Sequence, residues 1–195
     1  MSDVAQEIAA AAARWVVEEG LEYGPAKRRA VRDLGLGSRT ALPDNLLVET
    51  AVREYLEIFA ADTQPSELLA LRHLAAVWME RLSAYRPHLT GAVWRGTATR
   101  LNDIHLQLFC DDPKSAEIDL INQGLDYQVG STRGLKGESV DVLSLSVNCP
   151  DLNEHVGLHL SVLDLDDLRG ALLPDALGQP QRGDLRALRN LLDFA

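Results

Sequence analysis

The most informative segment of the sequence is residues 91–106, which read GAVWRGTATRLNDIHL. Two glycines, Gly91 and Gly96, precede a short linker and a stretch in which Asp103 and His105 alternate with apolar residues. A glycine turn lets backbone amides approach a phosphate closely. Side chains two residues apart on a strand point to the same face of its sheet. The segment therefore predicts a phosphate-facing turn followed by a strand that presents Asp103 and His105 together.

Ahead of this segment, the sequence has helical periodicity up to about Pro87. Apolar residues in the first stretch recur at the spacing of a helix with one buried face. Pro25 suits the first turn of a helix, and Asp44 and Thr63 suit the capping position of later ones. We expect helices over residues 3–19, from Pro25 to the glycines at 35–37, from Asp44 to about residue 60, and over 65–85.

After Pro87 the alternation changes to a period of two residues, which is typical of strands with one buried face. Expected strands cover residues 103–110, 126–130, 138–147 and 155–163, with a glycine-rich turn over 130–137. A helix should start at Pro113 and end near Gln123, and Asp166 and Asp184 should cap short C-terminal helices. The expected fold class is α+β, with a helical portion, residues 1–86, that packs on a core formed by residues 87–195.

Gly91, the pair Arg95-Gly96 and the run Asn102-Asp103-Ile104 resemble the signature of the nucleotidyltransferase superfamily, in its minimal DNA polymerase β-like form. The resemblance covers about residues 66–147. It implies a mixed β-sheet core with flanking helices. It also implies an enzyme that transfers a nucleoside monophosphate from a nucleoside triphosphate to a hydroxyl group, with Mg²⁺ or Mn²⁺ as the metal.

The resemblance also implies roles for individual residues. The triphosphate would lie against Gly91, Ala92, Arg95, Gly96 and Arg100. Catalysis and metal binding would fall to Asp103, His105 and Asp141. Carboxylates on neighbouring strands hold hard divalent cations between themselves and the phosphates, and Asp141 is an acid in an otherwise apolar predicted strand.

Two positions depart from the pattern. Ala92 stands where serine is usual, and His105 stands where a second carboxylate is usual. Imidazole suits zinc, iron or nickel better than magnesium. These departures favour the alternative function, a non-catalytic module that binds a nucleotide or a protein partner. His155 and His159, on one face of a predicted strand, could join His105 in a three-histidine metal site or simply lie exposed.

Composition limits the remaining classes. The chain has 195 residues, 46% of them hydrophobic, and a formal charge of −10, which indicates a globular protein that repels DNA and anionic membranes. Two cysteines are too few for a disulfide framework, and with no apolar run long enough to span a bilayer we expect a cytoplasmic protein. The acceptor that the resemblance implies would be a protein, an RNA or a small molecule. Surplus apolar surface on the N-terminal helices leaves room for a homodimer or a protein partner.

Overall fold

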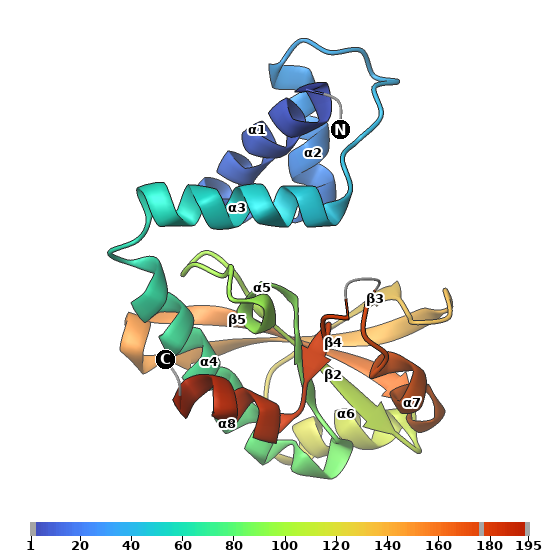
Figure 1. Ribbon diagram of the computed structural model, residues 1–195. Coiled ribbons are helices and arrows are strands. Elements are labelled where there is room, and N and C mark those ends of the chain that lie inside the picture. The colour runs from blue at the N-terminus through green and yellow to red at the C-terminus, as the bar shows by residue number, and fades with distance from the viewer. Residues whose placement is uncertain (1–2, 176–177, 194–195) are drawn as a thin grey trace. The chain divides into compact units, whose positions relative to one another are not determined.

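Helices fill the first half of the chain and a mixed sheet dominates the second (Figure 1). The computed structural model describes residues 3–175 and 178–193, and its α+β fold confirms the predicted class. The α-helices are α1 (Asp3–Glu19), α2 (Tyr23–Asp33), α3 (Asn45–Phe59), α4 (Gln64–Arg81), α5 (Gly91–Arg95), α6 (Pro113–Asn122), α7 (Leu168–Ala171) and α8 (Leu185–Asp193). The strands are β1 (His88–Thr90), β2 (Ile104–Cys110), β3 (Gln128–Arg133), β4 (Ser139–Cys149), β5 (Glu154–Asp164) and β6 (Arg182–Gly183).

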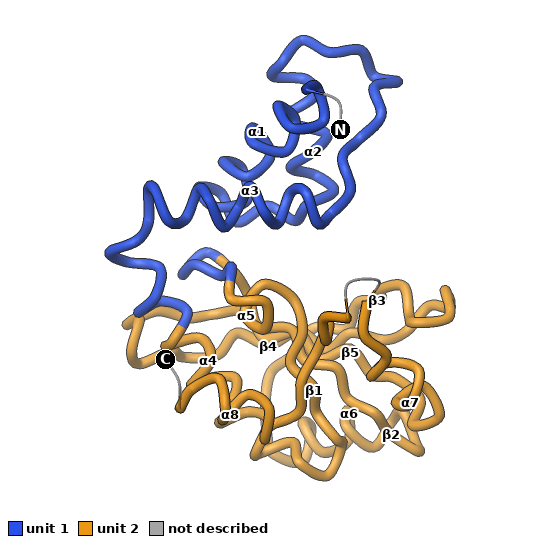
Figure 2. Tube along the Cα trace, in the orientation of Figure 1, with its two compact units in different colours: residues 1–68, 97–101 blue, residues 69–96, 102–195 orange. Residues whose placement is uncertain are grey.

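The chain divides into two compact units (Figure 2). Unit 1 comprises residues 1–68 and 97–101, and unit 2 comprises residues 69–96 and 102–195. The division falls inside α4, ahead of the predicted boundary between residues 86 and 87. The later part of α4 belongs with unit 2, where the Arg72 guanidinium donates hydrogen bonds to the carbonyls of Val93 (3.1 Å) and Trp94 (3.2 Å) in α5.

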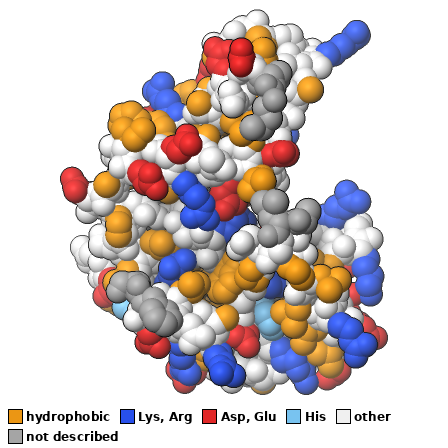
Figure 3. All heavy atoms as spheres, viewed as in Figure 1, with side chains coloured by type: hydrophobic (Ala, Val, Ile, Leu, Met, Phe, Trp, Pro, Cys, Tyr) orange, Lys and Arg blue, Asp and Glu red, His pale blue; other side chains and the backbone are white. Residues whose placement is uncertain are grey.

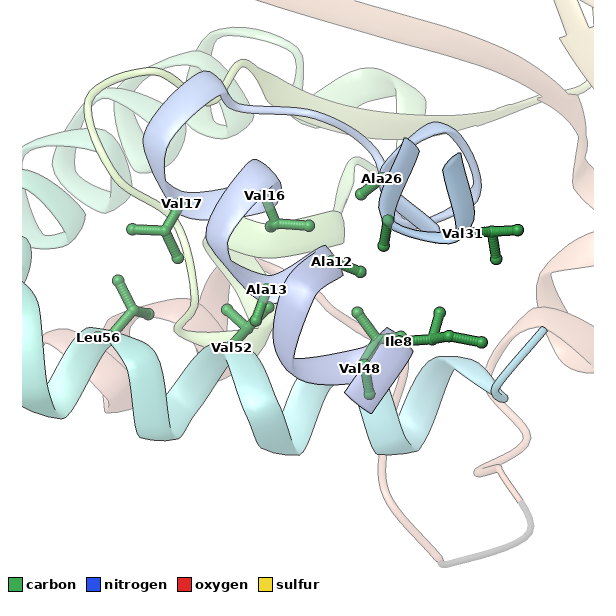
Figure 4. Close-up of a cluster of buried hydrophobic side chains, with 12 residues drawn as sticks. Ile8, Ala12, Ala13, Val16, Val17, Ala26, Val31, Val48, Val52 and Leu56 are labelled. Atoms are coloured by element: carbon green, nitrogen blue, oxygen red, sulfur yellow. The ribbon is translucent and has the colours of Figure 1, made fainter. Parts of the chain in front are cut away.

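Unit 1 is stabilised by a core of small and β-branched side chains from α1, α2 and α3 (Figure 4). Ala12 and Ala13 of α1 are almost completely buried, and Val48 and Val52 of α3 are completely buried. Small residues at a helix contact let the two backbones approach closely. This explains why an alanine-rich first helix can form a core with two short neighbours.

The predicted helix ends are confirmed where they depend on residues close in the sequence. α1 has the predicted bounds, and the Asp44 carboxylate accepts a hydrogen bond from the Leu47 amide at 2.7 Å, as a capping residue should. α4 ends at Arg81, earlier than predicted, and Arg86 adopts a left-handed conformation (φ 46°). Proline disfavours helical geometry in the preceding residue, so Pro87 fixes the end of this segment.

The sheet of unit 2 has the strand order β3-β4-β5-β2-β1-β6. β2 and β5 are parallel, and the other neighbouring pairs are antiparallel. Ile104, Leu106 and Leu108 of β2 are fully buried and project from one face of the sheet. His105 and Gln107 alternate with them and therefore project from the opposite face, which is lined mainly by polar side chains.

Strand ends differ from the predicted ones where turns are tight. β3 runs to Arg133, and the turn that follows is confined to residues 134–137, with the Gly134 amide bonded to the Glu138 carbonyl at 2.7 Å. Gly137 has φ 90°, a conformation that favours glycine. The short elements α5 and β6 have no periodic signal and were not predicted.

Charged side chains of both signs are interspersed over the face drawn in Figure 3, with hydrophobic side chains between them. Within the residues that the structure describes, no helix combines the length and the apolar character that crossing a membrane requires.

Candidate functional site on the polar face of the sheet

One row of side chains crosses every strand of the sheet. The paired positions are Gln128–Ser144, Ser144–His159, His159–His105, His105–Thr90 and Thr90–Arg182. Paired residues on neighbouring strands project from the same face. We call these six residues, Gln128, Ser144, His159, His105, Thr90 and Arg182, the polar rung. It brings together residues that lie far apart in the sequence.

Asp103 lies at the start of β2 and holds the ring of His159. Its Oδ2 is 2.9 Å from His159 Nε2, and its Oδ1 accepts a hydrogen bond from the Gly157 amide at 3.0 Å. A Cβ atom on Gly157 would lie 2.5 Å from the Asp103 carboxyl carbon. The missing side chain at residue 157 therefore makes the space that this carboxylate occupies.

His159 connects Asp103 to Ser144. Its Nδ1 lies 2.8 Å from Ser144 Oγ on the neighbouring strand. The hydrogen bond from His159 holds the pKa of Asp103 below its usual value, so this carboxylate is an acceptor only. Nε2 then carries a hydrogen towards Asp103, and Nδ1 is placed to accept a hydrogen bond from the Ser144 hydroxyl. The three side chains form a continuous relay.

His105 lies against the other side of this relay. Its ring stacks on that of His159, with centroids 4.9 Å apart and planes inclined by 24°. A Cβ atom on Gly91 would be 3.6 Å from His105 Cδ2. The structure thus brings Gly91, Asp103 and His105 together.

The relay predicts how stability depends on pH. Because the folded pKa of Asp103 is lowered, its ionised form stabilises the fold above its unfolded pKa of about 4, and that contribution is lost as pH falls through the folded value. Because Asp103 is half exposed, we expect Asp103→Asn to lower the free energy of unfolding by only about 1 kcal/mol near neutral pH. This difference from the wild type should shrink towards zero at acidic pH. Urea unfolding of the wild type and of Asp103→Asn, from neutral to acidic pH, tests this prediction. A difference that stays constant with pH would contradict the assignment.

Asp141 does not join this site, and the prediction that it shares a metal with Asp103 is wrong. Leu143 of β4 is buried in the core, and Asp141 is two residues away, so it projects from the core face, whereas Ser144 and Asp103 belong to the polar face. Asp141 instead lies 3.5 Å from Lys114 Nζ of α6. β2 lies between β5 and β1 and is not adjacent to β4, and the residue opposite His105 on β5 is His159.

The other predicted phosphate contacts have different surroundings. Gly96 caps α5 with φ 85°, and its amide donates to the Ala92 carbonyl at 2.9 Å. Arg95 is half-buried in the last turn of that helix. Arg100 belongs to unit 1, where its backbone amide donates to Glu67 Oε2 at 3.0 Å. A helix-capping role thus accounts for Gly96 without a phosphate.

Arg182 is a candidate that the sequence did not reveal, because β6 is too short to show a pattern. Its Nε and Nη1 are buried and have no hydrogen-bond partner within the described part of the chain. Burial lowers its pKa, yet a guanidinium stays charged at physiological pH. Unpaired buried donors cost about 1–3 kcal/mol each, so this position favours an anionic ligand.

The donor set does not fit Mg²⁺ or Mn²⁺. Both oxygens of Asp103 accept hydrogen bonds, and the positions that neighbour it on the sheet hold imidazoles. In residues 3–175 and 178–193, no group of three or more His, Cys, Asp or Glu side chains could hold a metal ion. His155 pairs with Asn148, four residues along β5 from His159, so the three-histidine cluster does not form there either.

Comparison with known proteins finds no matching family model and no matching curated protein. The function of the polar rung is therefore inferred from its own chemistry.

Proposed function

We propose that unit 2 is a divergent nucleotidyltransferase-like module that binds the phosphate groups of a nucleotide without carrying out two-metal transfer. The order of a short strand, the Gly91 turn and a strand that begins beside Asp103 supports the relationship. In this proposal Arg182 and His105 donate hydrogen bonds to the phosphate oxygens that metal ions would bind in an active enzyme. The non-catalytic alternative is thus preferred to nucleotidyl transfer.

The observation that carries the proposal is that Nε and Nη1 of Arg182 are buried and have no hydrogen-bond partner among the residues that the structure describes. It lies on the polar rung beside Thr90, which in turn is paired with His105. Neighbouring strands are about 4.8 Å apart, so the backbones at Arg182 and His105 are about 10 Å apart. Side chains that project from one face at that separation can reach a common phosphate group, to which arginine donates in a planar fork.

Calorimetric titration with ATP, AMP and adenosine, each with EDTA and with Mg²⁺, tests the proposal. We expect affinity to rise with the number of phosphates and not to depend on Mg²⁺. Arg182→Gln should weaken ATP binding at least about tenfold, because a charge-assisted hydrogen bond contributes about 1.5–3 kcal/mol. Arg189→Gln is the matched control, since Arg189 lies on α8 and pairs with Glu80.

Two results would contradict the proposal. One is the absence of heat at millimolar ATP, and the other is equal ATP affinity in Arg182→Gln and the wild type. Transfer of label from the α-phosphate to any acceptor would instead support the enzyme that the resemblance implies.

The partner and location predictions stay open beside this proposal. Leu46, Ile58 and Phe59 of α3 are at least half exposed, which is consistent with a homodimer or a protein partner on the N-terminal helices. The cytoplasmic location remains a prediction from the cysteine content and the apolar pattern.

A further inference from the structure

We propose that Ser144 is a nucleophile, activated by His159 and Asp103, that reacts with small carboxylic esters. This inference goes beyond nucleotide binding, since it assigns a covalent reaction to the same face of the sheet. It stands on the relay of three side chains and on an open depression beside Ser144.

The relay has the chemical order that activates a serine. An ionised acceptor, Asp103, orients the imidazole of His159, and the remaining ring nitrogen faces the Ser144 hydroxyl at 2.8 Å. A serine hydroxyl is a weak nucleophile unless an adjacent base accepts its proton. Familiar serine hydrolases place the serine at Nε2 and the aspartate at Nδ1. The two ring nitrogens are exchanged here, but one still donates to the acid while the other accepts from the serine.

The neighbours of the relay hold it in one geometry. The stacked ring of His105 restricts rotation of His159, and the amide of Gly157 fixes the second oxygen of Asp103. Three strands, β2, β4 and β5, therefore position the relay. Groups held by a rigid scaffold lose little freedom on reaction, which favours a functional role over a chance contact.

A depression of about 460 Å³ lies beside Ser144 and is open to solvent. It is lined by Asp126, Tyr127, Gln128, Ser144, Leu145 and Ser146. The pairing of β3 with β4 ends at Gln128 and Ser144, so the later residues of β4 have no partner on β3. The depression suits a small acyl group, and Gln128 brings an amide donor to the position opposite Ser144.

The reaction balances without a further reagent except water. Ser144 Oγ bonds to the carbonyl carbon of the ester while its proton moves to His159 Nδ1. The bond between that carbon and the ester oxygen then breaks, and the alcohol leaves with the proton from His159. Water attacks the acyl-Ser144 intermediate, His159 accepts the proton and returns it to Ser144 Oγ, and the carboxylic acid is released. Asp103 acts throughout as a positioning residue.

Labelling with a small fluorophosphonate, located by peptide mass spectrometry, tests the proposal. The probe bonds to an activated serine oxygen and releases fluoride. We expect one adduct, on Ser144, and none there in Ser144→Ala. His159→Gln should slow labelling at least about a hundredfold, because general-base assistance contributes about 10²–10⁴ in rate. Asp103→Asn should also slow it and change the pH profile of the labelling rate, which a purely structural aspartate would not alter.

Ser161→Ala is the matched control, since Ser161 lies on the same face of β5 one rung away, paired with Val142 and Gln107. It should label at the wild-type rate. Two outcomes overturn the proposal: no adduct on Ser144 in the wild type, or a labelling rate that is unchanged in a folded His159→Gln variant. ATP titration of Ser144→Ala separates the two proposals, because nucleotide binding should persist in that variant.

Discussion

Leu106→Ala is expected to lower the free energy of unfolding of unit 2 by about 3 kcal/mol, the middle of the range for a fully buried leucine. Leu106 is completely buried on the core face of β2, and truncation leaves a cavity among the rigid strands around it. Urea unfolding followed by circular dichroism measures the loss.

The neighbouring residue supplies the control for this prediction. His105 projects from the opposite face, so His105→Ala should change the free energy of unfolding by less than about 1 kcal/mol. Equal losses in the two variants would mean that the two faces of β2 are assigned incorrectly.

Gly157→Ala is expected to lower the free energy of unfolding by about 2 kcal/mol. The main reason is that Asp103 loses its hydrogen bonds to His159 and to the backbone amide of residue 157. The added Cβ would lie 2.5 Å from Oδ1 of Asp103, so the carboxylate must rotate away and lose both hydrogen bonds. The same substitution should slow fluorophosphonate labelling of Ser144, because His159 loses the group that orients it.

A double-mutant cycle isolates this clash. In an Asp103→Ala background the carboxylate is absent, so Gly157→Ala should lower the free energy of unfolding by less than about 0.5 kcal/mol. Alanine also has less backbone entropy than glycine in the unfolded chain, which offsets part of any remaining loss. If the cost of Gly157→Ala is the same in both backgrounds, Asp103 does not occupy the space beside residue 157.

The parts of this fold that were predictable depend on local chemistry. The helix cap Asp44, for example, acts within its own first turn and accepts the expected backbone hydrogen bond. The alternation in β2 likewise records burial on one face. Neighbouring residues set these features, so one sequence sufficed for them.

The site was predictable only in part because it depends on which strands become neighbours. Asp103 and His105 share a strand, and their common face follows from spacing alone. The parallel pairing of β2 with β5, which brings His159 to His105, is a long-range feature that no local pattern records. That pairing also removed Asp141 from the site.

Ser144 and Arg182 show two different reasons for a missed residue. Serine alternates with buried leucine in β4, so a polar face was detectable there, but its partner strand was not. Arg182 lies in a strand of two residues, which is too short for periodicity to have meaning.

The central claim is that Asp103, His159 and Ser144 form one hydrogen-bonded relay on the polar face of the sheet. The most direct test is long-range ¹H–¹⁵N NMR of the ring nitrogens in protein labelled with ¹⁵N-histidine. The His159 signals are assigned as those that are missing in His159→Gln. We predict a His159 ring that carries its hydrogen on Nε2 and accepts the Ser144 hydroxyl at Nδ1. A hydrogen on Nδ1, or the averaged signals of a ring that exchanges freely between both forms, would contradict the relay and the reactivity inferred from it.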